Sequence, residues 1–185
     1  MTKILDSSFF ARPVVTVAQA LIGKYLVKSY KGKILALQIT EVEAYDGEQD
    51  LASHSRFGKT DRNQAMFGQA GTIYTYLVYG MYWMLNITAD QPGYPAAVLI
   101  RSAGHITGPG NLTKKLGLDK SFNNKILSSE CGLWIEDRDS FIAQANIIAT
   151  PRIGIDYAGQ IWREKPYRFV VSPSNSIKKT ITHLQ

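Results

Sequence analysis

The sequence predicts a single α+β domain built around a largely antiparallel β-sheet with short helices. At 185 residues and 45% hydrophobic content, the chain is long enough for one sizeable core and short for two domains. Short apolar runs typical of strands are interspersed with short helical segments, without the strand–helix alternation of a parallel sheet. We expect the domain to span residues 1–171 and a polar, basic tail to span residues 172–185.

The N-terminal quarter predicts one packing helix and one strand–turn–strand unit. A short helix is expected between Thr16, as N-cap, and Gly23, as terminator. Residues 25–30 and 34–44 then have the β-branched and aromatic content of strands, and they are joined by a tight turn over residues 31–33. We expect this turn to be exposed.

The second of these strands carries two glutamates on the same parity as its apolar residues. The side chains that share one face by the two-residue period are Leu35, Leu37, Ile39, Glu41, Glu43 and Tyr45. Glutamates are usually exposed, so one interpretation is that both are solvated where the strand leaves the core. The other is a partly buried acid or base at a cleft.

A polar, glycine-containing stretch over residues 46–71 predicts a long loop, and loops of this length are usually functional. Arg56, Lys59 and Arg62 lie within seven residues and fit a phosphate-binding loop or a solvated charged loop equally well. His54, taken alone, is more typical of a hydrogen-bonded structural histidine than of a catalytic one.

Residues 72–88 hold the densest aromatic run and predict a β-hairpin that turns near Tyr79-Gly80. Four tyrosines and a tryptophan fall within ten residues. An exposed cluster of this kind invites association, so it either belongs to the core or meets a partner.

The rest of the chain predicts one buried strand, one short helix and several short strands. The buried strand covers residues 96–100 and ends at Arg101. A tight loop over residues 108–111 precedes the helix, which runs through Leu116 and closes at Gly117. The Gly-Pro-Gly within this loop is alone weak evidence for phosphate binding. The remaining strands are expected around residues 133–135, 147–149 and 168–171.

The composition favours a polyanionic partner without naming it. Lys plus Arg number 21 against 15 Asp plus Glu, which gives a formal net charge of +6. The single Cys131 allows no intramolecular disulfide, and the three histidines show no metal-ligand spacing, so we expect no metal site and a reducing compartment. No apolar run of membrane-spanning length and no export signal is visible, so we expect a soluble protein.

A series of short motifs occurs in order between residues 9 and 171. They are Glu41-Val42-Glu43-Ala44-Tyr45, Ser53-His54-Ser55, Arg62-Asn63-Gln64-Ala65-Met66-Phe67, Gly71-Thr72-Ile73-Tyr74-Thr75-Tyr76, Tyr79-Gly80-Met81-Tyr82, Asn86-Ile87-Thr88, Val98-Leu99-Ile100-Arg101, Gly108-Pro109-Gly110, Arg152-Ile153-Gly154-Ile155, and Trp162 with Lys165-Pro166-Tyr167-Arg168-Phe169. Together they closely resemble the alkyladenine (3-methyladenine) DNA glycosylase family.

The resemblance implies an enzyme that flips alkylated or deaminated purines out of duplex DNA and hydrolyses the N-glycosidic bond, without a covalent lysine intermediate, a metal or another cofactor. Glu43 would be the general base that deprotonates the attacking water, and Arg101 would help to position that water and keep Glu43 ionised. Tyr79, at the hairpin tip, would wedge into the duplex from the minor groove.

The resemblance also implies a base-binding pocket. Tyr45, His54 and Tyr76 would enclose the extruded base, and Asn86 would obstruct the exocyclic amine of guanine. The other residues expected in the pocket are Met66, Tyr74 and Leu99. Those expected to contact DNA elsewhere are Met81, Tyr82, Arg56, Lys59, Arg62, Lys114 and Lys115.

The chain departs from the family pattern in two places. The segment over residues 102–107 is shorter than the acidic, helical one usual there. Asn111 stands where the family typically has a lysine that contacts phosphate, and we expect Lys114 or Lys115 to compensate.

The implied pocket predicts the register of the hairpin. With a two-residue loop, Asn86 falls on the opposite face from Tyr76. With a three-residue loop over residues 79–81, position 76 pairs with 84 and both side chains share one face. We therefore expect an odd-length loop or a bulge.

Two other functions stay open: a non-catalytic nucleic-acid-binding module on the same fold, and an enzyme acting on small molecules, such as a nucleoside hydrolase. A pure binder has no need of Glu43 and Arg101 beside the aromatic set, which argues against the first. We expect a monomer with damaged double-stranded DNA as its partner and no membrane contact. The expected location is the cytoplasm, with the nucleoid, of a bacterium, or the nucleus of a eukaryote.

Overall fold

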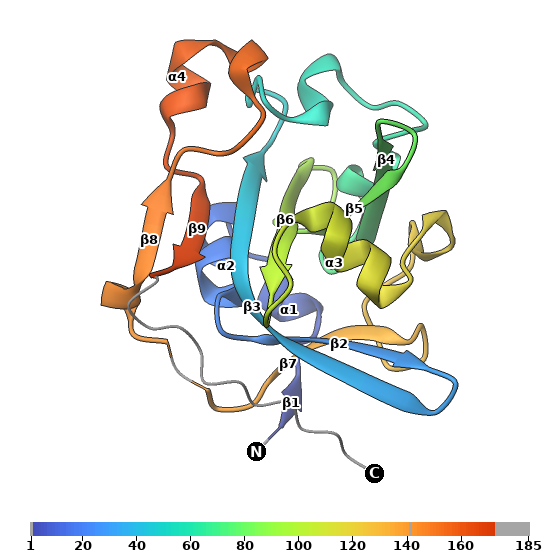
Figure 1. Cartoon of the computed structure of the whole chain (residues 1–185). Helices are drawn as coiled ribbons and strands as arrows, with labels where there is room; N and C mark the ends of the chain where they lie inside the picture. The colour runs from blue at the N-terminus through green and yellow to red at the C-terminus, as the bar shows by residue number, and fades with distance from the viewer. Residues whose placement is uncertain (1, 141, 173–185) are drawn as a thin grey trace.

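A nine-stranded sheet organises residues 2–140 and 142–172, which are the residues that the computed structural model describes (Figure 1). Seven strands follow one path in the order β1-β7-β2-β3-β6-β5-β4, and β9 pairs with both β3 and β8. Every pairing is antiparallel. The strands are β1 Lys3–Ile4, β2 Tyr25–Tyr30, β3 Lys33–Asp46, β4 Ile73–Val78, β5 Tyr82–Thr88, β6 Ala96–Ala103, β7 Leu133–Asp137, β8 Ile147–Thr150 and β9 Arg168–Val171.

The helices are short and lie around the sheet. The α-helices are α1 Ser7–Phe10, α2 Val14–Leu21, α3 Pro109–Leu116 and α4 Gly159–Glu164. The 3-10 helices are η1 His54–Phe57, η2 Gln64–Phe67, η3 Lys120–Phe122, η4 Gln144–Asn146 and η5 Asp156–Ala158. This arrangement confirms the predicted α+β class with a largely antiparallel sheet. The tail predicted for residues 172–185 lies, apart from residue 172, outside the described residues.

The ends of the helices agree with the sequence-based predictions in some places and differ in others. Helix α3 ends at Gly117, as predicted, in the left-handed conformation with φ 61°. It already begins at Pro109, so the loop predicted over residues 108–111 is wrong; proline is favoured in the first turn of a helix. Helix α2 begins at Val14 behind Pro13, so the prediction of Thr16 as N-cap is wrong. Proline already holds the φ angle that a helix start needs, and no side-chain cap is present there. Gly23 follows the end of α2 with φ 88°.

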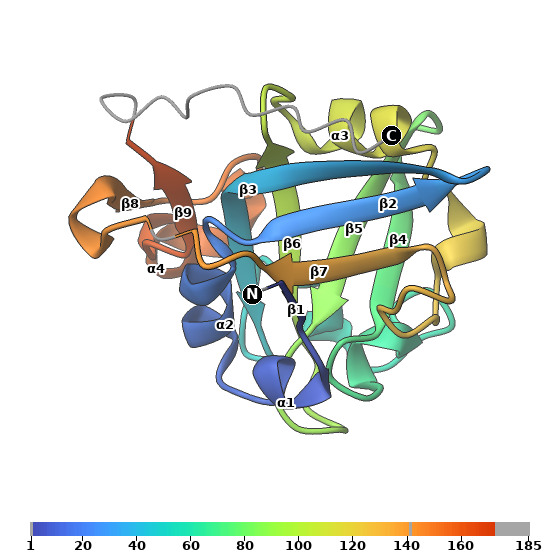
Figure 2. The same cartoon turned by 90° about the horizontal axis from the view of Figure 1, so that it is seen from below.

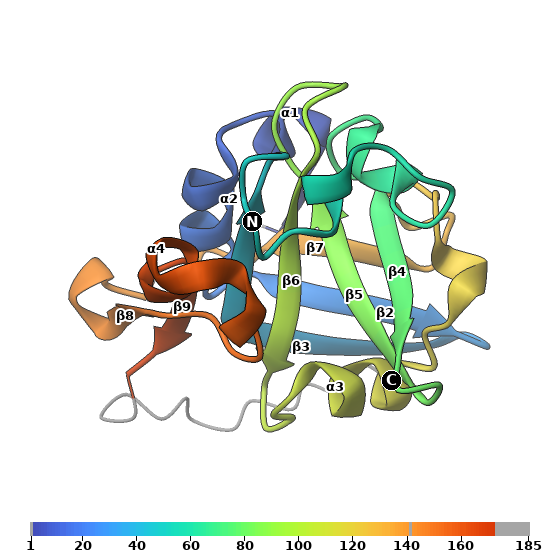
Figure 3. The same cartoon turned by 90° about the horizontal axis from the view of Figure 1, so that it is seen from above.

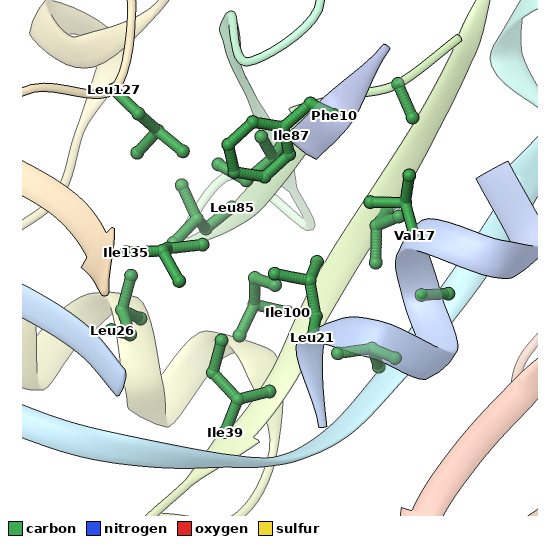
Figure 4. Close-up of a cluster of buried hydrophobic side chains, with 14 of the residues drawn as sticks. Phe10, Val17, Leu21, Leu26, Ile39, Leu85, Ile87, Ile100, Leu127 and Ile135 are labelled. Atoms are coloured by element: carbon green, nitrogen blue, oxygen red, sulfur yellow. The ribbon is translucent and has the colours of Figure 1, made fainter. Parts of the chain in front are cut away.

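Strand β3 joins two halves of the sheet. Its first part pairs with β2, and its second part pairs with β6 and β9. Seen from below, β2 and β7 cross the direction of β4, β5 and β6 (Figure 2). The main core fills the space between the halves, where Leu26 and Ile135 point toward Leu85 and Ile100 (Figure 4).

The pairing of β3 with β6 is irregular around Glu41, and this changes which face each side chain takes. The register shifts on both sides of Glu41. Ile39 belongs to the main core, but beyond the irregularity so do Val42 and Ala44. The prediction that Glu43 shares the face of Ile39 is therefore wrong, because the irregularity at Glu41 interrupts the two-residue period. Glu43 and Tyr45 lie on the opposite face.

The β4–β5 hairpin has the predicted odd-length loop. Tyr76 pairs with Met84, and Val78 pairs with Tyr82, which leaves residues 79–81 as the loop. Tyr79 at the tip is 86% exposed and has φ 52°. The hairpin therefore projects from the sheet with an aromatic ring in solvent.

Helix α3 braces this hairpin. The Thr113 hydroxyl donates a hydrogen bond to the carbonyl oxygen of Trp83 at 2.7 Å. The ring of Tyr82 lies so close to Gly110 that a Cβ there would stand 2.7 Å from a ring carbon. Gly110 thus permits the hairpin, at the residue that follows its loop, to pack directly on α3.

Candidate active site

Glu43 is the centre of the candidate site. Its side chain is completely buried, and its two carboxylate oxygens have three partners. Oε2 accepts a hydrogen bond from the Tyr45 hydroxyl at 2.9 Å, and Oε1 accepts one from the Ile153 backbone N–H at 2.8 Å. The Arg101 Nη1 lies 3.2 Å from Oε1. A buried carboxylate with a cationic partner is a typical feature of sites that carry out acid–base chemistry.

An aromatic pocket lies on the same face of the sheet. The predicted residues that line it are Tyr45, His54, Met66, Tyr74, Tyr76 and Asn86. Ala52, Ser53, Ala97 and Tyr157 line it as well. Leu99 does not; it is buried and is the register partner of both Glu43 and Asn86. Figure 3 shows how the segment between β3 and β4 passes over β5 and β6 to cover this face.

The sequence indicates some of these four additional pocket residues more clearly than others. Ala97 shares the parity of Leu99 on β6, so the strand period was sufficient to find it. Ala52 and Ser53 precede His54 in the same loop. Tyr157 enters from the C-terminal third, and its hydroxyl donates to the Ala52 carbonyl oxygen at 3.0 Å. In the sequence, the one indication that Tyr157 belongs to the pocket is its position two residues after the motif of residues 152–155.

One side of the pocket is formed by three aromatic rings in contact. The ring centroids of His54 and Tyr76 are 4.4 Å apart in an edge-to-face arrangement. His54 Nδ1 and the Tyr74 hydroxyl share a hydrogen bond of 2.9 Å, and the Tyr74 and Tyr76 rings are 5.4 Å apart. Such contacts fix the orientation of all three rings.

These rings are uncharged at neutral pH. Burial, with a smaller contribution from the positive charges of Arg62 and Arg56, lowers the pKa of His54 from 6.5 to about 4. Burial raises the pKa of Tyr74 to about 12 and raises the pKa of Tyr76 further. The pocket therefore presents neutral, electron-rich rings.

Tyr45 is held from behind by a buried ion pair. The Arg152 guanidinium carbon lies 4.8 Å from the centre of the Tyr45 ring. Arg152 makes a bidentate pair with Asp50, at 2.5 and 2.8 Å, and also donates to the Ala44 carbonyl oxygen. No role for Arg152 or Asp50 followed from the sequence. Their contact fixes the loop that begins after β3 to the C-terminal third of the chain.

The residues predicted to contact DNA outside the pocket are distributed over three elements. Met81 and Tyr82 are exposed beside Tyr79 at the hairpin. Lys114 and Lys115 are exposed in the last turn of α3, which packs against β5 of that hairpin. These residues therefore lie on the hairpin and on the helix that packs against it.

The three cationic side chains of the loop between β3 and β4 differ in how many contacts they make within the protein. Arg56 stacks between Phe57, at 4.4 Å, and Tyr157, at 4.7 Å, and donates to the Leu51 carbonyl oxygen. Lys59 and Arg62 are exposed. Arg62 also lies 5.7 Å over the Tyr76 ring at the pocket.

Among the described residues, no group of three or more His, Cys, Asp or Glu side chains is placed to hold a metal ion. In the same part of the chain, no helix has the length and apolar character needed to cross a membrane.

Comparison with known proteins identifies the family to which this architecture belongs. The model of the methylpurine-DNA glycosylase family matches residues 8–107 and 103–175. The chain belongs to this family. The resemblance drawn from the motifs is thereby confirmed.

Relatives of comparable length come from an archaeon and from bacteria. A protein of Methanocella arvoryzae is 38% identical, and the match covers 95% of this chain and 96% of the relative. A protein of Myxococcus xanthus is 39% identical over 95% and 93% of the two chains, and one of Legionella pneumophila strain Paris is 39% identical over 97% and 100%. Each is named "Putative 3-methyladenine DNA glycosylase".

Proposed function

We propose that the protein is a monofunctional DNA glycosylase that extrudes an alkylated or deaminated purine from duplex DNA and hydrolyses its N-glycosidic bond, leaving an abasic site. The observation that carries the proposal is the position of Glu43. Its buried carboxylate is hydrogen-bonded to Tyr45, which is itself a wall of the aromatic pocket. A base held against Tyr45 therefore lies close to a candidate general base.

The pocket suits a damaged purine. Stacking on an aromatic ring contributes about 1 to 3 kcal/mol per base. Tyr45, His54 and Tyr76 all line the pocket. Purines alkylated at N3 or N7 carry a positive charge, which electron-rich ring faces attract. Because His54 is neutral, it does not repel such a base.

Glu43 acts as the general base of the hydrolysis. It takes a proton from a water molecule whose oxygen bonds to the anomeric carbon of the sugar, while the bond from that carbon to the purine breaks and the bonding electrons leave with the base. The carboxylate charge also stabilises the oxocarbenium-like sugar of the transition state. Arg101 and the Ile153 N–H hold the carboxylate in place.

Extrusion of the nucleotide is assigned to the hairpin. The exposed Tyr79 ring enters the duplex and replaces the stacking lost when the base leaves, which costs a few kcal/mol. Met81 and Tyr82 accompany it, and Lys59, Arg62, Lys114 and Lys115 neutralise phosphates. Arg56 has its own aromatic and carbonyl partners, so its contribution is smaller.

A panel of duplex oligonucleotides tests the proposal. Each carries one ethenoadenine, hypoxanthine or methylated purine, and alkaline treatment after incubation cuts the strand wherever a base has been released. We expect cuts at damaged purines and none in the undamaged duplex. An absence of cuts across the panel, with DNA binding retained, would instead support a non-catalytic module. Release from free nucleosides but not from duplexes would support a nucleoside hydrolase. The monomeric state and the cellular location remain predictions.

A further inference from the structure

Glu41 has no role in the function proposed above, yet it makes more polar contacts than most carboxylates in the chain. Its Oε1 accepts hydrogen bonds from Arg101 Nε at 3.0 Å and from Arg168 Nε at 2.7 Å. Its Oε2 accepts one from the Ser102 hydroxyl at 2.6 Å. Glu41 thus connects β3 to both of its neighbours, β6 and β9, where the register of β3 with β6 is irregular.

Arg101 lies between the two glutamates of β3. Its Nε is bonded to Glu41 and its Nη1 lies 3.2 Å from Glu43. A guanidinium group is planar and rigid, so fixing the direction of Nε also fixes the direction of Nη1. The side chains of Arg101 and Glu41 are each only 12% exposed, which leaves little room for another arrangement.

The charges of this cluster are balanced only when Glu41 is ionised. Although burial acts to raise the pKa of Glu41, the hydrogen bonds from Ser102 and Arg168 and the charges of both arginines hold it below its ordinary value. Without the Glu41 carboxylate, Arg101 would have Glu43 as its one remaining carboxylate partner among the described residues. Arg168 would keep its bond to the Thr150 hydroxyl. Two guanidinium groups would then share a partly buried site with one carboxylate.

We propose that Glu41 is a positioning residue for base excision: it holds Arg101 by Nε so that Nη1 stays on the carboxylate of Glu43. Glu41 itself touches neither the base nor the attacking water. This inference rests on the proposed function, since it assigns Glu41 a part in that reaction through Arg101.

A double-mutant cycle on single-turnover base release tests the proposal. Glu41→Ala should slow release by about tenfold to a hundredfold, because a small misplacement of a catalytic group has an effect of that size. Binding to an abasic-site duplex should stay within about threefold, since the pocket and the hairpin are unchanged. In an Arg101→Ala background, Glu41→Ala should slow release by less than about threefold, because the group it positions is already gone. Glu41→Gln keeps an acceptor and should fall between the wild type and Glu41→Ala.

Glu136→Ala is the matched control. Glu136 is similarly buried on β7 and also accepts from an arginine Nε, that of Arg138, and from Trp134. It should lower the thermal midpoint of unfolding as Glu41→Ala does, but leave the rate of base release unchanged. If Glu136→Ala slows release equally, or if the effects of Glu41→Ala and Arg101→Ala multiply, the positioning role is wrong.

A second readout does not depend on activity. In ¹⁵N-labelled protein, the Arg101 Nε–H signal, identified by its loss in Arg101→Lys, should exchange slowly with solvent and become fast in Glu41→Ala. An unchanged exchange rate would overturn the positioning role even in an active enzyme. If the wild type releases no base from any duplex, the proposed function fails, whereas the NMR comparison still decides whether Glu41 holds Arg101.

Discussion

Tyr74 and Asn86 face each other across the β4–β5 hairpin and both line the aromatic pocket. The Asn86 Nδ2 donates to the Tyr74 carbonyl oxygen at 3.2 Å and approaches the Met84 carbonyl oxygen at 3.5 Å. The amide is thus held by backbone atoms of both strands, and it is buried. We expect a side chain fixed in this way to discriminate by shape, because it has no free rotation with which to accommodate an extra group on the base.

Replacement of Asn86 by glycine should relax discrimination against guanine-type bases. We expect the rate of release of 7-methylguanine to rise about tenfold relative to that of hypoxanthine, since the obstruction to the exocyclic amine is gone. The ratio of the two single-turnover rates is the quantity to measure, because any loss of folded protein cancels in it. A ratio equal to that of the wild type would remove Asn86 from this role.

Glu43→Gln should abolish base release while leaving DNA binding nearly intact. Glutamine keeps the shape of the side chain and an acceptor for Ile153 but cannot take a proton from water. We expect at least about a thousandfold slower single-turnover release, with binding to an abasic-site duplex within a few-fold of the wild type. Retained turnover would show that another group is the base.

Tyr79→Ser should weaken binding to a damaged site more than binding to undamaged duplex. The ring at the hairpin tip contributes only where a base has been extruded, so we expect about a tenfold loss confined to the damaged site. Tyr30→Ser is a suitable control, since Tyr30 is also an exposed tyrosine beside a hairpin turn, that of β2 and β3. Equal losses on both duplexes would contradict the wedge assignment.

The protonation of His54 should make stability depend on pH in a defined window. In the folded protein the pKa of His54 is about 4, whereas in the unfolded chain it is near 6.5. The unfolded state therefore binds the proton first as the pH falls, so stability is lost between about pH 6.5 and 4 and is unaffected by this group above pH 6.5. The loss amounts to at most about 3 kcal/mol.

Denaturant unfolding at pH 7.5, 5.5 and 4 measures this contribution, with His54→Gln as the comparison. Glutamine does not titrate, so the variant should lose less stability than the wild type between pH 6.5 and 4. Parallel curves for the two proteins would show that His54 is not the group responsible.

The sequence was sufficient to predict features that depend on a local residue pattern or on a single geometric requirement. The hairpin loop of residues 79–81 followed from the need to place Tyr76 and Asn86 on one face, and the end of α3 followed from Gly117. The face of Glu43 could not be predicted, because it depends on the irregular pairing of β3 with β6 around Glu41. A two-residue period read from one strand does not contain that information.

Contacts between distant parts of the chain were also beyond the sequence. Asp50 and Arg152 are 102 residues apart, and neither sits in a pattern that predicts an ion pair. The same holds for Glu41 and Arg168, which are brought together only when β9 pairs with β3. From the sequence, charged residues of this kind are expected to be exposed. The fold shows that they are buried or partly buried and paired with each other.

Tyr79 combines an exposed ring with a backbone conformation that aromatic residues rarely adopt, at φ 52°. Both features are unfavourable in the unbound protein, the backbone conformation by about 1 kcal/mol or more. Asparagine, which tolerates this conformation, would be expected to make the resting protein more stable. Selection for heat resistance alone would therefore favour replacement of Tyr79. A thermostable variant obtained in that way would retain the pocket but lose the ring that we propose enters the duplex.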